Sequence, residues 1–128
     1  MTAPTDALSV FTDGACAGNP GRGGWAWAVD RSTYDSGFEA VTTNQRMEIK
    51  AALEAVTTLP PPLLVVSDST YVVNCFRDRW WEKWLLNGWL TSAKKPVTNR
   101  DLWEPLVHSG HMMNDFVDQL AVEACRRG

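Results

Sequence analysis

Four acidic residues in this sequence could act together, because each belongs to a different predicted element near one edge of a sheet. They are Asp13, Glu48, Asp68 and Asp118. Neighbouring carboxylates repel one another unless they are protonated or bridged by a cation, and such an oxygen-rich cluster suits Mg²⁺. Two ions about 3.5–4 Å apart can activate a water molecule and stabilise the leaving oxygen of a phosphodiester displacement.

Taken one at a time, these acids also have ordinary structural interpretations. Asp13 precedes a glycine, as in many turns, and Glu48 places a negative charge favourably near the start of a predicted helix. Asp68 could cap a helix, and Asp118 could be a solvated charge on a helix surface. A shared site therefore depends on the elements that would bring the four acids together.

The first of these elements is a predicted three-stranded antiparallel meander. Ala7–Thr12, Trp25–Asp30 and Gly37–Thr42 are short segments rich in strand-forming residues. The first of them is predicted to end at Asp13-Gly14. The segment Cys16–Gly24 contains four glycines and one proline, which predicts a loop or wide turn. Short connections of this kind favour antiparallel neighbours.

A helix and a buried strand are predicted next. Within Arg46–Leu59, apolar residues recur with helical spacing at Ile49, Ala52, Leu53 and Val56. Prolines 60–62 stop this helix, and the apolar run Leu63–Val66 predicts a strand covered on both faces. A strand that follows a helical crossover lies parallel to its neighbour, so Asp13 and Asp68 are expected at the same carboxyl edge, with Glu48 in the first turn of the helix.

The rest of the chain is predicted to be mainly helical. Helices are expected over residues 70–87, at Asn99–Trp103 and from Asn114 to Arg127, with a polar stretch between the first two. Together with the meander and the central strand, they predict an α/β fold in which a mixed sheet is layered with helices.

Composition limits the function classes. The 128 residues have room for one domain, 1–128, in which residues 1–6 are expected to form a disordered tail. No apolar run reaches the ~18 residues of a membrane span and no leader peptide is evident, so a cytoplasmic location is expected. The three cysteines are too widely spaced for a zinc site or a disulfide framework. The net charge of −3 taken alone argues against a nucleic-acid partner, since phosphate binding needs clustered Lys and Arg.

Five ordered motifs resemble the ribonuclease HI family. They are FTDGACAGNPGRGGWAW, TTNQRMEIKAALEAV, VVSDSTYVV, WWEKWLLNGWLTSAKKPVTNRDLW and HSGHMMNDFVDQLAVEA, and they extend from about Leu8 to Ala124. The resemblance implies a ribonuclease H-like mixed sheet, an antiparallel meander plus a parallel central strand, flanked by helices. It also implies a monomeric endonuclease that hydrolyses RNA in RNA/DNA hybrids. Mg²⁺ or Mn²⁺ would be its cofactor, in a two-metal mechanism that leaves 5′-phosphate and 3′-hydroxyl ends.

Carried over by position, the resemblance assigns roles to individual residues. The metal ligands are the same four acids, Asp13, Glu48, Asp68 and Asp118. The family's mobile histidine, which assists proton transfer or product release, falls on His108 in a loop, with His111 as its neighbour. Hybrid-contacting positions are the small or amide residues Cys16, Asn19, Asn44, Gln45, Ser69 and Thr70. Asn19 could instead be a turn residue only, and Asn44 a helix cap only.

The tryptophan-rich segment 80–103 resembles the family's basic protrusion, which grips the DNA strand. Lys94, Lys95 and Arg100 would then meet phosphates, and Trp84 would contact the substrate. Most of the five tryptophans in this segment are expected to pack in the core instead. Some positions that are often basic in relatives are apolar in this chain, at Leu85, Leu86 and Leu90. A weaker grip on the backbone is therefore expected.

One element of the family has no evident counterpart. The family usually has a fifth strand before the histidine, but only four residues separate Trp103 from His108. Pro105 is expected to end or kink the helix and to leave Leu106-Val107 as at most a two-residue stub. The fifth strand is therefore predicted to be missing or very short. Leu63–Ser67 would then be an apolar edge strand, which a partner chain in a dimer could cover.

Two other functions stay open at this point. A non-catalytic hybrid-binding module on the same fold would result if the lost strand abolished activity, although such a module would not require all four acids. A resolvase or integrase core would not explain the tryptophan-rich segment. If four of the 15 acids are metal ligands, two bound Mg²⁺ bring the net charge from −3 to about +1, so the charge no longer argues against nucleic acid.

Overall fold

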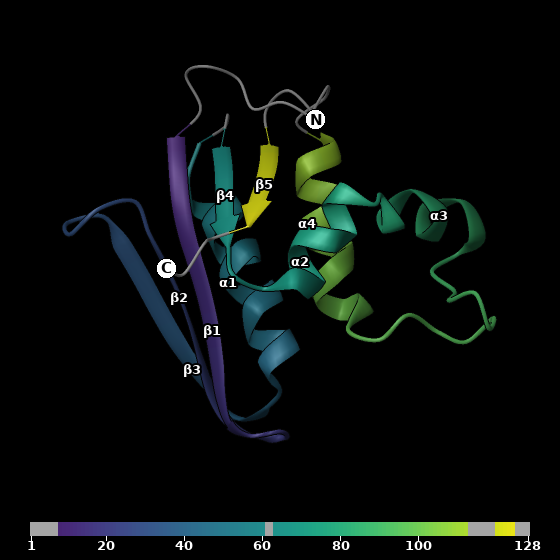
Figure 1. Cartoon of the computed structure of the whole chain (residues 1–128), viewed down its shortest axis with the longest axis horizontal. Helices are drawn as coiled ribbons and strands as arrows, with labels where there is room; N and C mark the ends of the chain where they lie inside the picture. The colour runs from purple at the N-terminus through teal and green to yellow at the C-terminus, as the bar shows by residue number, and fades with distance from the viewer. Residues whose placement is uncertain (1–7, 61–62, 113–119, 125–128) are drawn as a thin grey trace.

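A mixed five-stranded sheet with helices packed along it forms the described part of the chain (Figure 1). This computed structural model describes residues 8–60, 63–112 and 120–124. In chain order the elements are β1 Leu8–Gly18, β2 Gly21–Ala28, β3 Tyr34–Thr42, α1 Asn44–Thr58, β4 Leu63–Ser67, α2 Thr70–Arg77, α3 Trp80–Asn87, α4 Arg100–Met112 and β5 Leu120–Ala124. None of these helices is long and apolar enough to cross a membrane.

The strand order β3-β2-β1-β4-β5 confirms the predicted α/β class. The first three strands form an antiparallel meander, and β4 lies parallel to both β1 and β5. Helix α1 packs against β1 and β2, and α4 packs against α1. The central strand is therefore reached by a helical crossover, as the sequence predicts.

The first two strands of the meander are longer than predicted. β1 continues past Asp13-Gly14 and β2 begins at Gly21, so the prediction of a loop over Cys16–Gly24 is wrong. Asn19-Pro20, joined by a cis peptide bond, form the turn. The glycines serve close strand packing as well as turning, because a Cβ at Gly23 would lie 2.7 Å from a carbonyl oxygen of β1.

Helix α1 follows the predicted apolar spacing and forms one side of the core. Thr43 caps it, since its Oγ1 accepts a hydrogen bond from the Arg46 N–H at 3.2 Å, so the helix begins two residues before the predicted start. The predicted apolar face is buried at Ile49, Ala52, Leu53 and Val56. These side chains join one core cluster with Val10 of β1 and Val65 of β4.

Strand β4 lies inside the sheet and not at its edge. Its residues pair with Leu8–Thr12 of β1 on one side and with β5 on the other. The prediction that Leu63–Ser67 forms an exposed edge is therefore wrong, and β4 has no free edge for a partner chain to cover. Alternate residues of β4 are buried and half-buried, so its two faces are not equally covered.

Helix α4 is longer than predicted. It runs through Pro105 to Met112, and Leu106 and Val107 are buried helical residues instead of a strand stub. A proline removes one helical hydrogen bond, and the burial of these two side chains offsets that loss. No strand lies between Trp103 and His108, as predicted.

Strand β5 is formed by residues that the apolar spacing predicts to be helical. Leu120–Ala124 lies beside β4 in parallel register (Figure 1), so the sheet keeps a fifth strand although no strand lies between Trp103 and His108. Pairing with β5 supplies hydrogen-bond partners for the backbone N–H and C=O groups at this edge of β4. This gain outweighs the helical preference of a short segment. The other residues of the predicted C-terminal helix lie outside the described part of the chain, as does the predicted tail 1–6.

An aromatic cluster joins α3 and the loop after it to the rest of the molecule. Its members are Tyr71, Trp80, Trp84, Trp89 and Trp103, with ring centroids 5.2 to 6.2 Å apart in the contacting pairs. The Trp103 Nε1–H donates a hydrogen bond to the Tyr71 hydroxyl at 3.0 Å. Trp81, Trp89 and Trp103 are buried, which confirms that most tryptophans of this segment are core residues.

A close backbone contact joins β1 to α1 at Gly14. A Cβ at this position would lie 2.4 Å from the Met47 carbonyl carbon and 2.5 Å from the Glu48 backbone nitrogen. Only a residue without a side chain allows the strand and the helix to approach so closely. The contact holds the part of α1 that carries Glu48 against the part of β1 that carries Asp13.

We expect Gly14→Ala to lower the free energy of unfolding by about 1–3 kcal/mol, because the added methyl group forces β1 and α1 apart. Thermal denaturation followed by circular dichroism measures the loss. Gly24→Ala in β2 is the matched control, since its methyl group would meet the Gly37 carbonyl oxygen at 3.2 Å and should cost less. Equal losses in the two variants would contradict the role given to the Gly14 contact.

Candidate active site

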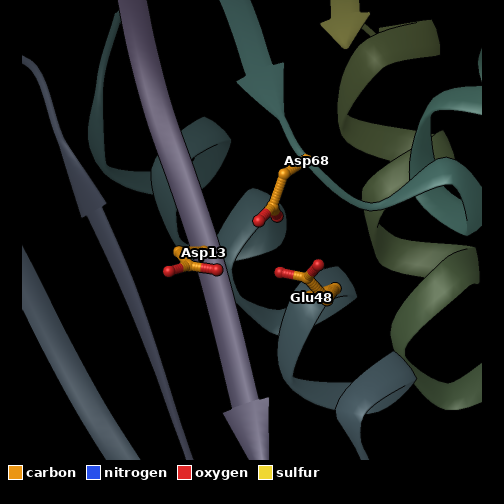
Figure 2. Close-up of side chains that lie close together, drawn as sticks. All are labelled: Asp13, Glu48 and Asp68. Carbon is orange, nitrogen blue, oxygen red and sulfur yellow. The ribbon is translucent and has the colours of Figure 1, made fainter. Parts of the chain in front are cut away.

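Three of the four predicted acids lie together in the structure (Figure 2). Asp13 comes from the middle of β1, Asp68 directly follows β4, and Glu48 comes from α1. One carboxylate oxygen of each residue lies within 4.8 Å of the others. The three carboxyl groups face a common space between β1, the end of β4 and α1.

The register of the sheet explains this convergence. Thr12 pairs with Ser67 in the parallel β1–β4 ladder, so Asp13 and Asp68 are the next residues on neighbouring strands. The contact at Gly14 then brings α1 close enough for Glu48 to reach them. The sequence therefore predicts this juxtaposition correctly, although Asp13 lies inside β1 and not at its end.

The ordinary interpretations of these three acids are wrong. Asp13 is not a turn residue, because β1 continues to Gly18. A negative charge favours a helix when it lies in the first turn. Glu48 is the fifth residue of α1 and lies beyond that turn. Ser69, and not Asp68, caps α2, since the Ser69 Oγ accepts a hydrogen bond from the Val72 N–H at 3.2 Å.

The electrostatic environment of Glu48 is strongly unfavourable for a charge. Burial raises the pKa of Glu48 to about 8, and the charge of Asp68, a hydrogen bond with the Asp68 carboxyl group and the charge of Asp13 act in the same direction. A hydrogen bond donated by the Gly14 N–H opposes this shift. The Glu48 Oε1 atom is buried and has no hydrogen-bond partner among the described residues. A cation placed among the three carboxylates would remove this cost.

The donor set fits a hard divalent cation. The three side chains offer only carboxylate oxygen atoms, which are the ligands that Mg²⁺ and Mn²⁺ prefer. Of the His and Cys side chains in the described part of the chain, none joins the group. The fit therefore rests on the chemistry of the donors and on the buried, unpartnered Glu48 oxygen.

The other predicted catalytic residues are Asp118 and the histidine pair. Asp118 lies outside the described residues. His108 and His111 lie in α4 and not in a loop, because the helix continues through Pro105. The His108 side chain is exposed and is not among those that gather around Asp13.

Four of the predicted hybrid-contacting residues lie near the β1–β2 turn and the start of α1. Asn19 lies in that turn, and its Oδ1 accepts a hydrogen bond from the Asn44 backbone N–H at 3.1 Å. Asn44 and Gln45 are exposed and follow the cap of α1, so Asn44 is not the cap. Cys16 is half-buried, and its thiol donates to the Thr42 carbonyl oxygen at 3.4 Å.

Ser69 and Thr70 stand at the start of α2, directly after Asp68. Ser69 is nearly buried, and its N–H donates a hydrogen bond to the Ser67 Oγ at 3.1 Å. Thr70 is exposed. The contacts of Ser69 fix the direction of the backbone after β4 and thereby the position of Asp68.

The two predicted phosphate-binding lysines lie in the loop between α3 and α4. Lys94 and Lys95 are exposed in a tight turn that begins at Thr91. The Thr91 N–H donates to the Lys95 carbonyl oxygen at 2.7 Å, and the Lys95 N–H donates to the Thr91 Oγ1 at 3.2 Å. The turn is therefore held by its own backbone while both ammonium groups stay in solvent.

Arg100 and Trp84 are engaged within the molecule. The Arg100 guanidinium lies 5.6 Å from the Trp89 ring centroid and forms an ion pair with Glu104 at 3.0 Å. Trp84 is half-buried in the aromatic cluster. Leu86 occupies one of the positions that are often basic in the family that the sequence resembles. Its side chain is 85% exposed, so α3 presents an apolar surface there.

A side-chain clamp joins α1 to α4 through Arg46, two residues before Glu48, and is not evident from the sequence. The Arg46 guanidinium forms a bidentate ion pair with Asp101 at 2.7 and 2.9 Å and donates to the Asn99 Oδ1 at 3.2 Å. The hydrogen bond between them raises the pKa of Arg46 and holds the pKa of Asp101 below its usual range. The partners are 55 positions apart, so no local spacing signals the pair. The clamp ties the end of the lysine-bearing loop to α1.

A family model and curated relatives, compared with this sequence, agree on one family. The RNase H family model matches residues 5–126 of the chain. A curated relative named ribonuclease H, from Thermoanaerobacter sp. (strain X514), is 42% identical over 147 positions that cover 99% of this chain and 95% of the relative. A ribonuclease H from Nitratidesulfovibrio vulgaris (strain DP4) is 46% identical over 142 positions, which cover 94% of this chain and 91% of that protein.

A solved structure shares the fold. LC11-RNase H1 in complex with an RNA/DNA hybrid matches with a TM-score of 0.65 at 20% sequence identity, over 93% of this chain and 85% of that chain. At this level of identity the match shows the fold alone.

The sequence match also shows that the chain is shortened. The alignment with the Thermoanaerobacter relative runs over 147 positions, which is 19 more than the 128 residues of the chain. At least that many positions of the relative therefore have no counterpart here.

The raised pKa of Glu48 predicts how the stability of the metal-free protein depends on pH. In the unfolded chain this carboxyl group loses its proton above its ordinary pKa of 4.5, whereas in the folded protein it keeps the proton up to about pH 8. The unfolded state then binds fewer protons, so stability falls as the pH rises through this window. Because solvent screens a half-buried group, we expect Glu48→Gln to stabilise the metal-free protein by about 1–3 kcal/mol near pH 8.5 and by much less near pH 5.

Thermal denaturation in a chelating buffer at the two pH values measures this effect. Glu54→Gln is the matched control, because it makes the same substitution on α1 at a residue paired with Lys50 at 3.1 Å, away from the acid cluster. That variant should shift the Tm little at either pH. A gain in Glu48→Gln that is equal at both pH values would show that the charge of Glu48 is not its cause.

Proposed function

Because this chain belongs to the ribonuclease H family and is a ribonuclease H enzyme, we propose that it is a metal-dependent endonuclease acting on the RNA strand of RNA/DNA hybrids. Its products would carry 5′-phosphate and 3′-hydroxyl ends. The observation that carries the proposal is the convergence of Asp13, Glu48 and Asp68 within 4.8 Å. The RNA/DNA hybrid bound to LC11-RNase H1, a protein of the same fold, supports the choice of substrate.

The acids would hold the cofactor. Asp13, Glu48 and Asp68, together with Asp118, are proposed to bind two divalent ions, Mg²⁺ or Mn²⁺. Such ions supply an activated water molecule and stabilise the charge on the leaving oxygen. The protein positions its carboxylates through the β1–β4 register and the Gly14 N–H, and Glu48 has to release the proton that it keeps in the metal-free site.

His108 is proposed to assist proton transfer or product release. An imidazole can accept and donate a proton near neutral pH, and the exposed side chain of His108 is accessible to solvent and substrate. Because it stands apart from the acid cluster in the structure, its effect on the rate should be smaller than that of the carboxylates.

The substrate contacts are proposed in two groups. Small and amide side chains would contact the sugars and backbone of the hybrid, including the 2′-hydroxyl that distinguishes RNA from DNA. They are Cys16, Asn19, Asn44, Gln45, Ser69 and Thr70. On the other side of the site, Lys94 and Lys95 would bind phosphates of the DNA strand, with Trp84 beside them. The expected cytoplasmic location and monomeric state stay predictions.

Asp13→Asn tests the site directly. The substitution keeps the size of the side chain but removes a charged ligand, so we expect it to abolish cleavage of a labelled RNA/DNA hybrid in Mg²⁺ while hybrid binding survives. Gel electrophoresis of the products and a filter-binding assay measure the two properties. Asp35→Asn on β3, an exposed aspartate that accepts a hydrogen bond from the Ser36 N–H, is the matched control and should cleave normally.

The same gel distinguishes an enzyme from a binding module. The wild-type protein is incubated with an RNA/DNA hybrid, duplex RNA and duplex DNA, each with and without Mg²⁺. Cleavage of the hybrid alone, and only with metal, is the expected result. Hybrid binding without any cleavage would favour a non-catalytic module, and retained turnover in Asp13→Asn would remove Asp13 from the site.

We expect His108→Ala to slow cleavage without ending it, by no more than the roughly 10²- to 10⁴-fold contribution of a general acid–base. Single-turnover kinetics at saturating enzyme measure the chemical step, and multiple-turnover kinetics report product release. His111→Ala is the comparison on the same helix. If it is the more damaging change, the roles of the two histidines are exchanged.

A further inference from the structure

We propose that Arg22, stacked on Phe38, binds a phosphate of the RNA strand a few nucleotides from the point of cleavage. The inference rests on the proposed function, because it takes the strand that is cut as the strand that passes Asp13. Arg22 lies on β2 and Phe38 on β3, and neither residue is in the acid cluster or among the substrate contacts proposed above.

A groove along β1 and β2 leads from the acids to Arg22. It consists of three adjoining hollows with volumes of about 270, 220 and 510 Å³. Asp13 and Asp68 line the first hollow, and Arg22 and Phe38 line the third. Neighbouring hollows share wall residues, which are Asp13, Ala26, Ala15 and Gly24. The groove is therefore continuous with the candidate active site.

Small side chains form the floor of this groove. Alternate residues of a strand share one face, so Ala15 and Ala17 follow Asp13 on β1, and their register partners on β2 are Gly24 and Arg22. No side chain larger than a methyl group stands on β1 or β2 in the floor between the acid and the guanidinium. A strand advances ~3.3 Å per residue, so the four residues from Asp13 to Ala17 span roughly 13 Å.

No acid among the described residues forms an ion pair that would neutralise the charge of Arg22. Four other arginines lie within 3.8 Å of a carboxylate, namely Arg46, Arg77, Arg79 and Arg100. In the described part of the chain, Arg22 forms no such ion pair. Its guanidinium carbon instead lies 5.5 Å from the ring centroid of Phe38, which is 68% exposed. Stacking restricts the guanidinium without cancelling its charge, so its N–H groups can bind a phosphate.

The position of the groove identifies the strand. The acids act on the strand that is cut, and the groove continues directly from Asp13. By contrast, Lys94 and Lys95 lie in the loop beyond α3, on the far side of the molecule from the β2–β3 pair (Figure 1). An RNA strand that leaves the acids along the groove therefore meets Arg22 first.

The salt dependence of hybrid binding tests the contact. Each phosphate contact contributes about 0.9 to the slope of log affinity against log salt concentration. In a chelating buffer, which keeps the RNA intact, we expect Arg22→Gln to reduce this slope by about one contact and to weaken binding roughly three- to tenfold near 0.1 M salt. Arg31→Gln removes the same charge from the turn at the other end of β2 and should change neither quantity.

A second measurement assigns the contact to one strand. Hybrids carry a single uncharged methylphosphonate linkage, placed in turn along the RNA strand and along the DNA strand. Wild-type protein should lose affinity at one RNA position near the cleavage site, and Arg22→Gln should lose nothing further there.

The outcomes separate this inference from the proposed function. If Arg22→Gln and Arg31→Gln bind alike, or if the affected linkage lies in the DNA strand, the inference is overturned, whereas cleavage of the hybrid by the wild-type protein would still support the proposed function. If the wild-type protein neither binds nor cleaves the hybrid, both fail.

Discussion

The backbone contact between β1 and α1 at Gly14 determines the geometry of the candidate site. It sets the distance between the strand that carries Asp13 and the helix that carries Glu48, and its N–H is the donor that partly compensates the buried Glu48 carboxylate. The parallel register with β4 then adds Asp68. Three carboxyl groups are thus held together by main-chain packing, and their mutual repulsion is one reason why Glu48 keeps its proton in the metal-free site.

Much of this arrangement can be predicted from the sequence, because the spacing of apolar residues indicates which face of an element is buried. The apolar spacing of α1 and the short run Leu63–Val66 specify a crossover helix and a parallel strand, and these place Asp13 beside Asp68. The glycine-rich segment 16–24 misleads, because glycine can mark either a turn or a close approach between paired strands, and cross-strand contacts decide which. The strand at Leu120–Ala124 is unpredictable for a similar reason, since the partner that favours it, β4, lies elsewhere in the chain.

The distribution of charged side chains around the site cannot be read from the net charge of the chain. A net charge of −3 says nothing of how charges are distributed, and the fold pairs several arginines with nearby acids while it leaves Lys94, Lys95 and Arg22 without an ion pair among the described residues. The clamp of Arg46 with Asp101 shows why sequence cannot reveal this, because its partners meet only once α1 and α4 have packed. The convergence of Asp13, Glu48 and Asp68 could be predicted, but the basic residues left for a polyanion emerge only from the tertiary structure.

The position of β5 in the chain sets an order of events during synthesis. Gly18 and Gly21 pair across the β1–β2 turn, so that hairpin can form as soon as its own residues leave the ribosome. The β4–β5 ladder instead joins Leu63 to Leu120, 57 positions later, and synthesis of this stretch takes roughly 3–11 s at typical bacterial to eukaryotic rates. During that interval the apolar strand β4 has an open edge. The growing chain therefore passes through a stage in which β4 is prone to pair with other chains. In the finished sheet both edges of β4 are paired, with β1 and with β5.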